Sequence, residues 1–270
     1  MADDQTSDQT ADGARPLAVV TGASSGIGLE FARIFAQEGY ALVVNAEDAA
    51  IHDAAGQLGG VSVEAVQADL ATRAGVHEVV RALGGRAVDA LVLNAGVGLG
   101  GPFLETDLDA ELRMIDLNVK AVVHLAKHLL PRMVARGKGR VLVTSSIAAQ
   151  MPAPFEAVYA GTKAFGLLFA EGIRNELKDT GVTVTALQPG PTETNFFHRA
   201  GMDDTKVGQD KKDDPAKVAR DGYDAMMAGK DHVVGGSFMN KVQSVLLEAM
   251  PETLKAEVHR KLSEPGSGTK

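Results

Sequence analysis

A glycine-rich turn between an apolar run and a helical pattern constrains this sequence more than any other feature. Residues 16–20, Pro-Leu-Ala-Val-Val, have the composition of a buried parallel strand. Residues 21–28, Thr-Gly-Ala-Ser-Ser-Gly-Ile-Gly, follow directly, and residues 29–38 have the spacing of an amphipathic helix. Glycine permits a tight turn and lets backbone N–H groups approach a pyrophosphate at the helix N-terminus. The pattern predicts a dinucleotide site; the alternative is a turn that only connects two elements.

Strand and helix patterns alternate along the rest of the chain. The further strand-like runs are 41–45, 61–66, 88–93, 141–144, 182–187 and 232–234. This alternation favours an α/β fold: a Rossmann-type, doubly wound, mainly parallel seven-stranded sheet with helices on both faces. A chain of 270 residues with 45% apolar residues is long enough for one such domain. We expect a disordered leader at 1–14, a single domain at 15–262 and a flexible tail at 263–270.

Composition argues against several classes of function. Cysteine is absent, which excludes disulfides, thiolate metal sites and cysteine nucleophiles. The formal net charge of −8 and the 4% aromatic content argue against nucleic acid and anionic membranes as partners, since these select basic faces and stacking rings. Apolar runs stay well short of the roughly 20 residues that span a bilayer, and the first residues are acidic rather than signal-like. We expect a soluble, cytoplasmic protein.

Tyr159 and Lys163 are four residues apart in a helical pattern, which places both side chains on one helix face. A nearby cation favours the phenolate and lowers the pKa of a tyrosine from its ordinary value of about 10. Tyr159 is therefore a candidate general acid/base. Ser146 follows the strand-like run 141–144, where its hydroxyl is placed to hydrogen-bond the oxygen that Tyr159 protonates. A tyrosine–lysine pair at this spacing also arises by chance on many helices.

Several motifs in a fixed order make the pattern more specific. The glycine turn, Asn94-Ala95-Gly96 after the fourth strand and the Ser146, Tyr159 and Lys163 set together resemble the short-chain dehydrogenase/reductase (SDR) family. The resemblance runs from about residue 15 to the 230s. It implies a reversible hydride transfer between a nicotinamide cofactor and a secondary alcohol or ketone. Asn118 aligns with the family's fourth catalytic residue, which holds a water near the lysine through a helix irregularity.

The resemblance also implies a set of cofactor contacts. Family members that use NADP often carry arginine at the position of Glu47, and residues 21–28 here contain no basic side chain. Because the carboxylates of Glu47 and Asp48 would repel a 2′-phosphate, NAD is favoured and NADP is the alternative. For Asp69, a local helix N-cap is an alternative role. The expected contacts are Gly22, Ser24, Ser25, Gly26, Ile27, Gly28, Glu47, Asp69, Leu70, Asn94, Ala95, Gly96, Tyr159, Lys163, Pro189, Gly190, Thr192 and Thr194.

The substrate side is less clearly marked. Residues at about 191–214 are polar and charged and contain Phe196-Phe197, which fits a substrate lid. The loop 148–156 is mostly apolar and indicates a carbonyl substrate with an apolar body, with Glu156 expected at the solvent. His124 and His128 share a helix face without a third ligand candidate, so no metal site is expected.

The sequence is compatible with three hypotheses of function. The first is the alcohol/ketone oxidoreductase. The second is an NAD(P)-binding regulator of the same fold without turnover, and the third is an epimerase or dehydratase that uses NAD transiently. The chain after residue 195 looks too short for the larger substrate domain of the third class. The resemblance also implies a homodimer or homotetramer formed through the helices at 108–136 and 157–178.

Overall fold

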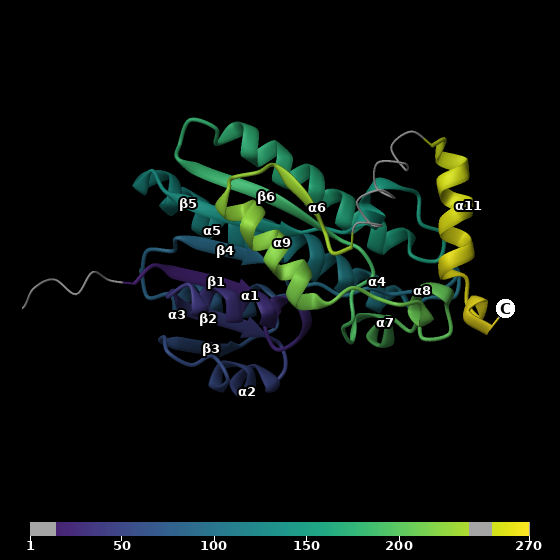
Figure 1. The fold of residues 1–270 in the computed structure, drawn as a ribbon, viewed down its shortest axis with the longest axis horizontal. Helices are drawn as coiled ribbons and strands as arrows, with labels where there is room; N and C mark the ends of the chain where they lie inside the picture. Colours follow the sequence, from purple (N-terminus) through teal and green to yellow (C-terminus); the bar gives the residue numbers. More distant parts are fainter. Residues whose placement is uncertain (1–14, 238–249, 270) are drawn as a thin grey trace, which may run out of the picture.

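The part of the chain that the structure describes, residues 15–237 and 250–269, is built around a parallel sheet of seven strands (Figure 1). The structure is a computed structural model. Its strand order is β3-β2-β1-β4-β5-β6-β7, with parallel pairing throughout. The strands are β1 (Leu17–Thr21), β2 (Ala41–Ala46), β3 (Val63–Gln67), β4 (Ala90–Leu93), β5 (Gly139–Thr144), β6 (Val182–Pro189) and β7 (His232–Gly235). The predicted Rossmann-type α/β fold is confirmed.

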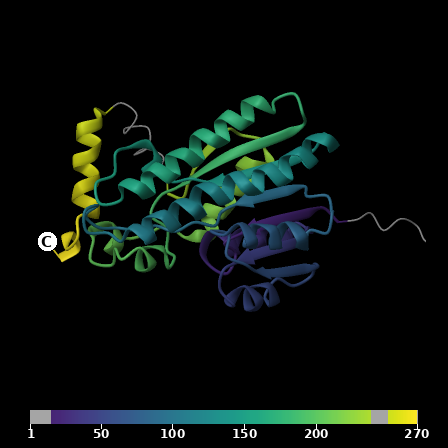
Figure 2. The same cartoon turned by 180° about the vertical axis from the view of Figure 1, so that it is seen from behind.

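Helices cover both faces of the sheet. They are α1 (Gly26–Gln37), α2 (Ala50–Gly56), α3 (Arg73–Ala82), α4 (Leu108–Ile115), α5 (Ala121–Arg136), α6 (Ala157–Glu176), α7 (Phe196–Arg199), α8 (Lys206–Gln209), α9 (Pro215–Met227) and α11 (Glu252–Ser263). Alternate residues of β1 point to opposite faces, so Ala18 and Val20 pack with α1, α2 and α9, while Leu17 and Val19 pack with α3, α5 and α6. Figure 2 shows the second face, with α5 and α6 crossing it side by side.

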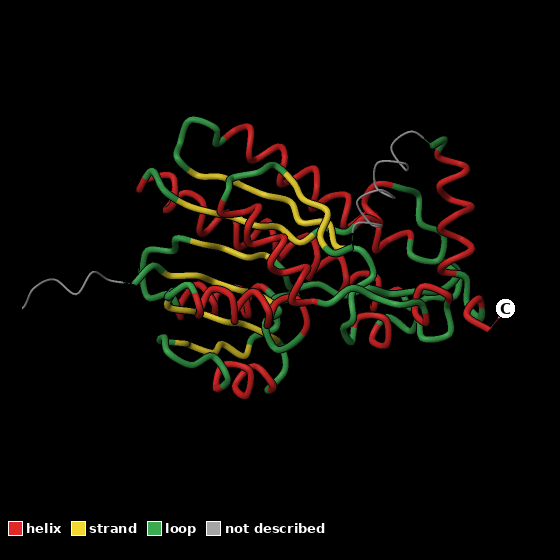
Figure 3. The backbone as a smooth tube through the Cα atoms, viewed as in Figure 1, coloured by secondary structure: helices red, strands yellow, loops and turns green. Residues whose placement is uncertain are grey.

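The strand order reverses beside β1, which pairs with β2 on one side and β4 on the other. In open parallel sheets a crevice forms at such a point, outside the C-terminal ends of the strands. The loops that leave these strand ends gather at one end of the molecule, together with α7, α8 and α11 (Figures 1 and 3). This end of the sheet is therefore where a ligand site is expected.

The C-terminal helix α11 stands across this end of the molecule, next to α8 (Figure 1). Beyond it, part of the predicted flexible tail forms a 3₁₀ turn, Ser267–Thr269. The Gly268 N–H donates to the Asp204 carbonyl (2.9 Å), and the Gly266 N–H donates to the Asp204 carboxylate (2.8 Å). These bonds hold the segment against residues 191–214, which we call the lid segment. The predicted leader, 1–14, and residues 238–249 of the predicted domain lie outside the described residues.

No helix within residues 15–237 and 250–269 combines enough length with enough apolar character to cross a membrane.

Candidate active site

A cavity of about 740 Å³ follows the C-terminal ends of the central strands. Every residue of the expected cofactor set lines it, from Gly22 at the glycine turn to Thr194 in the lid segment. Ser146, Tyr159 and Lys163 lie at its other end, where α11 also contributes side chains. The cavity therefore joins the expected cofactor contacts to the expected catalytic side chains, although the roles of these residues stay predictions.

The glycine turn after β1 has no room for side chains. Gly22 has φ = +65°, and a Cβ there would lie 2.8 Å from the Ala95 Cα. A Cβ on Gly28 would lie only 2.0 Å from the Gly22 carbonyl oxygen. The N-cap residue of α1, Ser25, makes no side-chain bond to the helix, so the first N–H groups of α1 are not capped from within the turn. A tight backbone cradle at an uncapped helix N-terminus fits a pyrophosphate.

Asn94 ties together the three strands under this cradle. Its side-chain Nδ2 donates to the Thr21 carbonyl at the end of β1 (3.1 Å), and its Oδ1 accepts from the Thr144 hydroxyl at the end of β5 (3.2 Å). The Thr21 hydroxyl in turn accepts the N–H groups of Asn94 (2.9 Å) and Ala95 (3.0 Å). The floor of the cavity is thus fixed by hydrogen bonds between strand ends.

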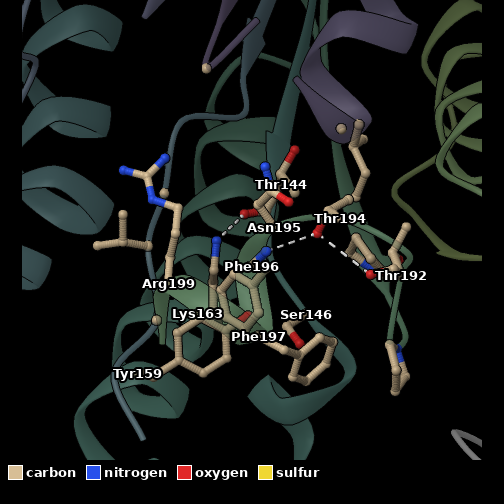
Figure 4. A pocket seen from close by; sticks show the side chains of 18 of the residues that line it. Thr144, Ser146, Tyr159, Lys163, Thr192, Thr194, Asn195, Phe196, Phe197 and Arg199 are labelled. Atoms are coloured by element: carbon tan, nitrogen blue, oxygen red, sulfur yellow. Dashed lines mark hydrogen bonds between the residues drawn. The ribbon is translucent and has the colours of Figure 1, made fainter. Parts of the chain in front are cut away.

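The Tyr159 side chain is buried at 8% exposure, and the Ser146 hydroxyl lies near enough to favour the phenolate. Lys163 lies one turn further along α6, with Nζ 5.8 Å from the centre of the Tyr159 ring. Its Nζ donates to the Thr144 carbonyl (3.1 Å). Figure 4 shows Ser146, Tyr159 and Lys163 around one part of the pocket. The structure thus brings together the three side chains that the sequence pattern paired.

The charge state of Tyr159 differs from the sequence expectation. Burial, and secondly the nearby Glu156 carboxyl, raise the pKa of Tyr159 above its ordinary value, and the Ser146 side chain only partly offsets this. Burial also lowers the pKa of Lys163 to about 8. The expected lowering of the Tyr159 pKa by Lys163 is absent because Nζ turns to the Thr144 carbonyl while both groups are desolvated. The phenol is therefore held protonated, as a proton donor requires.

Asn118 lies in a π-helical turn, Asp116–Lys120, inserted between α4 and α5. Its Nδ2 donates to the Val97 carbonyl (2.9 Å) and the Thr162 hydroxyl (3.0 Å), and its Oδ1 accepts the Val97 N–H (3.0 Å). A Cβ added to Gly96 would lie 3.1 Å from both the Asn118 Oδ1 and the Lys163 Nζ. Asn118 therefore lies near Lys163, in the helix irregularity that the resemblance implied.

Two arginines meet the carboxylates at the far end of the cavity. Arg113 of α4 bonds both Glu47 (2.8 Å) and Asp69 (2.9 Å), and Arg199 of α7 pairs with Glu47 as well. The sequence argument for NAD rested on the lack of a basic residue near Glu47, and it missed both arginines because they follow 66 and 152 residues later. The alternative role of Asp69 as a helix N-cap is not found, because Thr72 caps α3.

The substrate end of the cavity is closed by the lid segment and α11. Phe196 lies with its ring centre 5.2 Å from that of Tyr159 and covers Gly98, where a Cβ would lie 2.4 Å from the phenyl ring. Apolar side chains from the loop and from α11, Met151, Val258 and Leu262, line the same end. The mostly apolar wall predicted for this region is present.

Glu156 is buried at 7% exposure, which corrects the expectation that it reaches solvent. The Ser263 hydroxyl donates to its carboxyl (2.9 Å), and Nε2 of His259 lies 3.3 Å from the same oxygen. Burial raises the pKa of Glu156 to about 7. Sequence reasoning missed His259 and Ser263, because residue 263 was assigned to the flexible tail. In the structure both belong to α11, where their i, i+4 spacing places them on one face.

Known proteins resemble this chain over most of its length. The family model described as short chain dehydrogenase matches residues 16–205. Serine 3-dehydrogenase of Agrobacterium fabrum is 35% identical over 181 residues, which is 66% of this chain and 72% of that protein. Dehydrogenase/reductase SDR family member 7B of Mus musculus is 31% identical over 240 residues, which is 82% of this chain and 73% of that protein.

Solved structures agree with the fold. A short-chain dehydrogenase from Sphingobium yanoikuyae in complex with NADPH has a TM-score of 0.77 at 29% identity, covering 87% of this chain and 96% of that one. The 3-ketoacyl-(acyl-carrier-protein) reductase from Brucella melitensis complexed with NADH has a TM-score of 0.72 at 28% identity, covering 82% and 97%. Because the family model matches residues 16–205 and a relative is 31% identical over 82% of the chain, the chain belongs to the short-chain dehydrogenase/reductase family of NAD(P)-dependent oxidoreductases.

Proposed function

We propose that this protein interconverts a secondary alcohol and a ketone by hydride transfer, with Tyr159 as the general acid/base. The observation that carries the proposal is that Ser146, Tyr159 and Lys163 line one cavity together with the glycine cradle. A substrate oxygen placed between the Tyr159 and Ser146 hydroxyls would share this cavity with the expected nicotinamide contacts, Thr192 and Thr194. Position and electrostatics are what the protein adds to such a reaction.

In the reducing direction, Tyr159 donates its phenol proton to the carbonyl oxygen while the Ser146 hydroxyl hydrogen-bonds the same oxygen. A nicotinamide held beside Thr192 and Thr194 would supply or accept the hydride. Lys163 would hold its ribose, and Asn118 supports the return of a proton to the Lys163 side. In the oxidising direction the same groups act in reverse: Tyr159 first loses its own proton toward the Lys163 side, and as the phenolate it then accepts the alcohol proton.

NAD is the proposed cofactor, with NADP as the alternative. Glu47 is positioned to accept hydrogen bonds from the adenosine ribose. It also pairs with Arg113 and Arg199, so a 2′-phosphate would have to separate the carboxylate from its arginines. The relatives do not decide the question, because one of the solved structures contains NADPH and another NADH.

The proposed substrate is a ketone or secondary alcohol with an apolar body. Phe196, Met151, Val258 and Leu262 surround the space beside Tyr159. The Glu156 carboxyl, with Ser263 and His259 beside it, adds polar groups to this wall. A homodimer or homotetramer formed through residues 108–136 and 157–178, and a cytoplasmic location, remain proposals that light scattering and cell fractionation would test.

The test is a matrix of NAD and NADP against alcohols and ketones of graded size, followed by the absorbance of the reduced cofactor. We expect net redox turnover with apolar secondary alcohols or ketones, absent in Tyr159→Phe although the variant still binds cofactor. Cofactor binding without turnover across the matrix would favour the regulator. Product formation without net redox change would favour the epimerase or dehydratase.

A further inference from the structure

Three histidines gather on the outer surface of the face covered by α3, α5 and α6. His77 belongs to α3, and His124 and His128 belong to α5. The ring centres of His124 and His128 are 5.0 Å apart, and His77 stands edge-on to both, at 5.2 and 5.6 Å. The sequence offered no third partner for the α5 pair. The structure supplies one from a helix more than 40 residues away, which corrects the reason for expecting no metal.

The backbone presents the three rings to one point. His124 and His128 are one helical turn apart, so their side chains leave α5 from the same face. α3 packs against α5 on the sheet, with Val76 buried in the shared core next to the exposed His77. Packing of the two helices therefore fixes the distance between the α3 ring and the α5 pair.

The distances suit a metal ion after small side-chain rotations. Ligand nitrogens from the three residues lie within 4.8 Å of one another. Around a tetrahedral zinc ion with Zn–N bonds of about 2.0–2.1 Å, ligand nitrogens are about 3.4 Å apart. His77 is exposed and the α5 pair is half-buried, so all three rings have room to turn.

The cluster has no part in the reaction proposed above. None of the three histidines lines the catalytic cavity. Contact between three imidazoles adds little to the stability of the protein when no ligand is bound, because any protonated ring repels its neighbours. Within the described residues, this is the one group of three or more histidine or acidic side chains whose ligand atoms meet in this way.

We propose that His77, His124 and His128 form a surface site for Zn²⁺, which joins α3 to α5. Neutral imidazole is a preferred ligand of zinc, and three protein ligands leave a fourth position for water. Arg73, one turn before His77, adds positive charge near His124 and weakens the site. Because the ion binds the folded arrangement, it stabilises the packing of the two helices.

The test uses the full chain without an affinity tag, stripped of metal and titrated with Zn²⁺ by calorimetry. We expect one zinc per chain and a Tm raised by several degrees. His77→Ala and His124→Ala should each weaken zinc binding by about tenfold or more. Mg²⁺, which prefers oxygen ligands, should not bind there. Arg73→Gln should tighten zinc binding.

His52→Ala is the matched control, since His52 is an exposed histidine on α2, away from the cluster. It should leave zinc affinity unchanged, and circular dichroism should show that the alanine variants at 77 and 124 remain folded. The proposal is overturned if zinc binds only at millimolar concentration, if His77→Ala binds as well as the parent, or if His52→Ala loses as much affinity. A stoichiometry of one zinc per two chains would also overturn it, because the site would then lie between subunits.

Discussion

The two ends of the catalytic cavity are built in different ways. The cofactor end is made of backbone: a glycine turn without room for a Cβ, an uncapped helix N-terminus and strand ends joined by Asn94. The substrate end is made of side chains from three separated segments, namely the loop before α6, the lid segment and α11. α11 also lies outside the residues that the family model matches. Backbone shape is suited to a ligand shared by many enzymes, whereas side chains can be exchanged to suit one substrate.

The largest expected effect tests the chemistry at the substrate end. Tyr159→Phe keeps the ring and removes the proton donor, so we expect kcat to fall by about 10²–10⁴-fold while cofactor affinity is retained. Tyr223→Phe, which changes another buried tyrosine on α9, is the control and should keep kcat. Steady-state kinetics with fluorescence titration of the cofactor measures both. A Tyr159→Phe enzyme with parental kcat would remove the proposed mechanism.

The backbone character of the cofactor end predicts a second large effect. Gly28→Ala places a Cβ 2.0 Å from the Gly22 carbonyl, so we expect the free energy of unfolding to fall by more than about 2 kcal/mol and cofactor binding to be lost. Gly172→Ala on α6 meets nothing within 4 Å and should instead stabilise the protein by about 0.5–1 kcal/mol. Urea denaturation of both variants makes the comparison. If the two substitutions behave alike, the cradle is not tight.

The side-chain character of the substrate end predicts a pH effect. The pKa of Glu156 rises from its ordinary 4.5 to about 7 on folding, so the folded protein binds an extra proton between these values. The stability that this proton confers is present below about pH 4.5 and is lost as the pH rises through about 7. We expect a loss of roughly 2–3 kcal/mol in the free energy of unfolding from this group.

Glu156→Gln keeps the shape of the side chain and removes its titration. The unfolding free energy of the variant should therefore fall less between pH 5 and pH 8 than that of the parent, by about the 2–3 kcal/mol given above. Comparison of the two proteins matters because burial lowers the pKa of His259, which has the opposite effect at acid pH. Glu176→Gln on α6, an exposed site, should follow the parent. If the unfolding free energies of Glu156→Gln and the parent change with pH in parallel, the Glu156 carboxyl does not have a raised pKa in the folded protein.

The smallest effect concerns the charged side chains at the cofactor end, where Glu47 pairs with Arg113 and Arg199. Glu47→Gln removes the charge that pairs with Arg113 and Arg199, so both arginines become available to a 2′-phosphate. We expect the ratio of kcat/KM for NADP over NAD to rise by about three- to tenfold, a modest change because the groups are partly exposed. Glu38→Gln, at an exposed carboxylate on the end of α1, should leave the ratio unchanged. An unchanged ratio in Glu47→Gln would show that Glu47 does not select the cofactor.

The features that sequence predicted are those that a short stretch encodes. Each strand carries its own apolar run, the glycine turn carries its own steric need, and Tyr159 and Lys163 share one helix. The structure agrees with these local features. Ser146 was inferred from its position after the strand-like run 141–144, whereas the resemblance to the family indicated Asn118, 45 residues before Lys163.

The features that sequence did not predict depend on how distant segments pack. Arg199 reaches Glu47 across 152 residues, and Ser263 reaches Glu156 across 107. His77 joins the α5 pair only because α3 and α5 share one sheet face. No pattern within a short stretch of sequence indicates which distant residues will be in contact. The sign of the Tyr159 pKa shift was missed for the same reason, since burial comes from the assembled core.

The π-helical turn Asp116–Lys120 joins α4 to α5 and changes the direction in which the side chains of α5 point relative to those of α4. An α-helix advances about 100° per residue, so one extra residue in a turn rotates everything beyond it by that amount. With this rotation, Asn118 bonds Thr162, the neighbour of Lys163 on α6, while Leu125 and Leu129 still pack in the core under the sheet. Deleting a single residue from the turn would restore a regular helix and force these two surfaces to compete for one orientation.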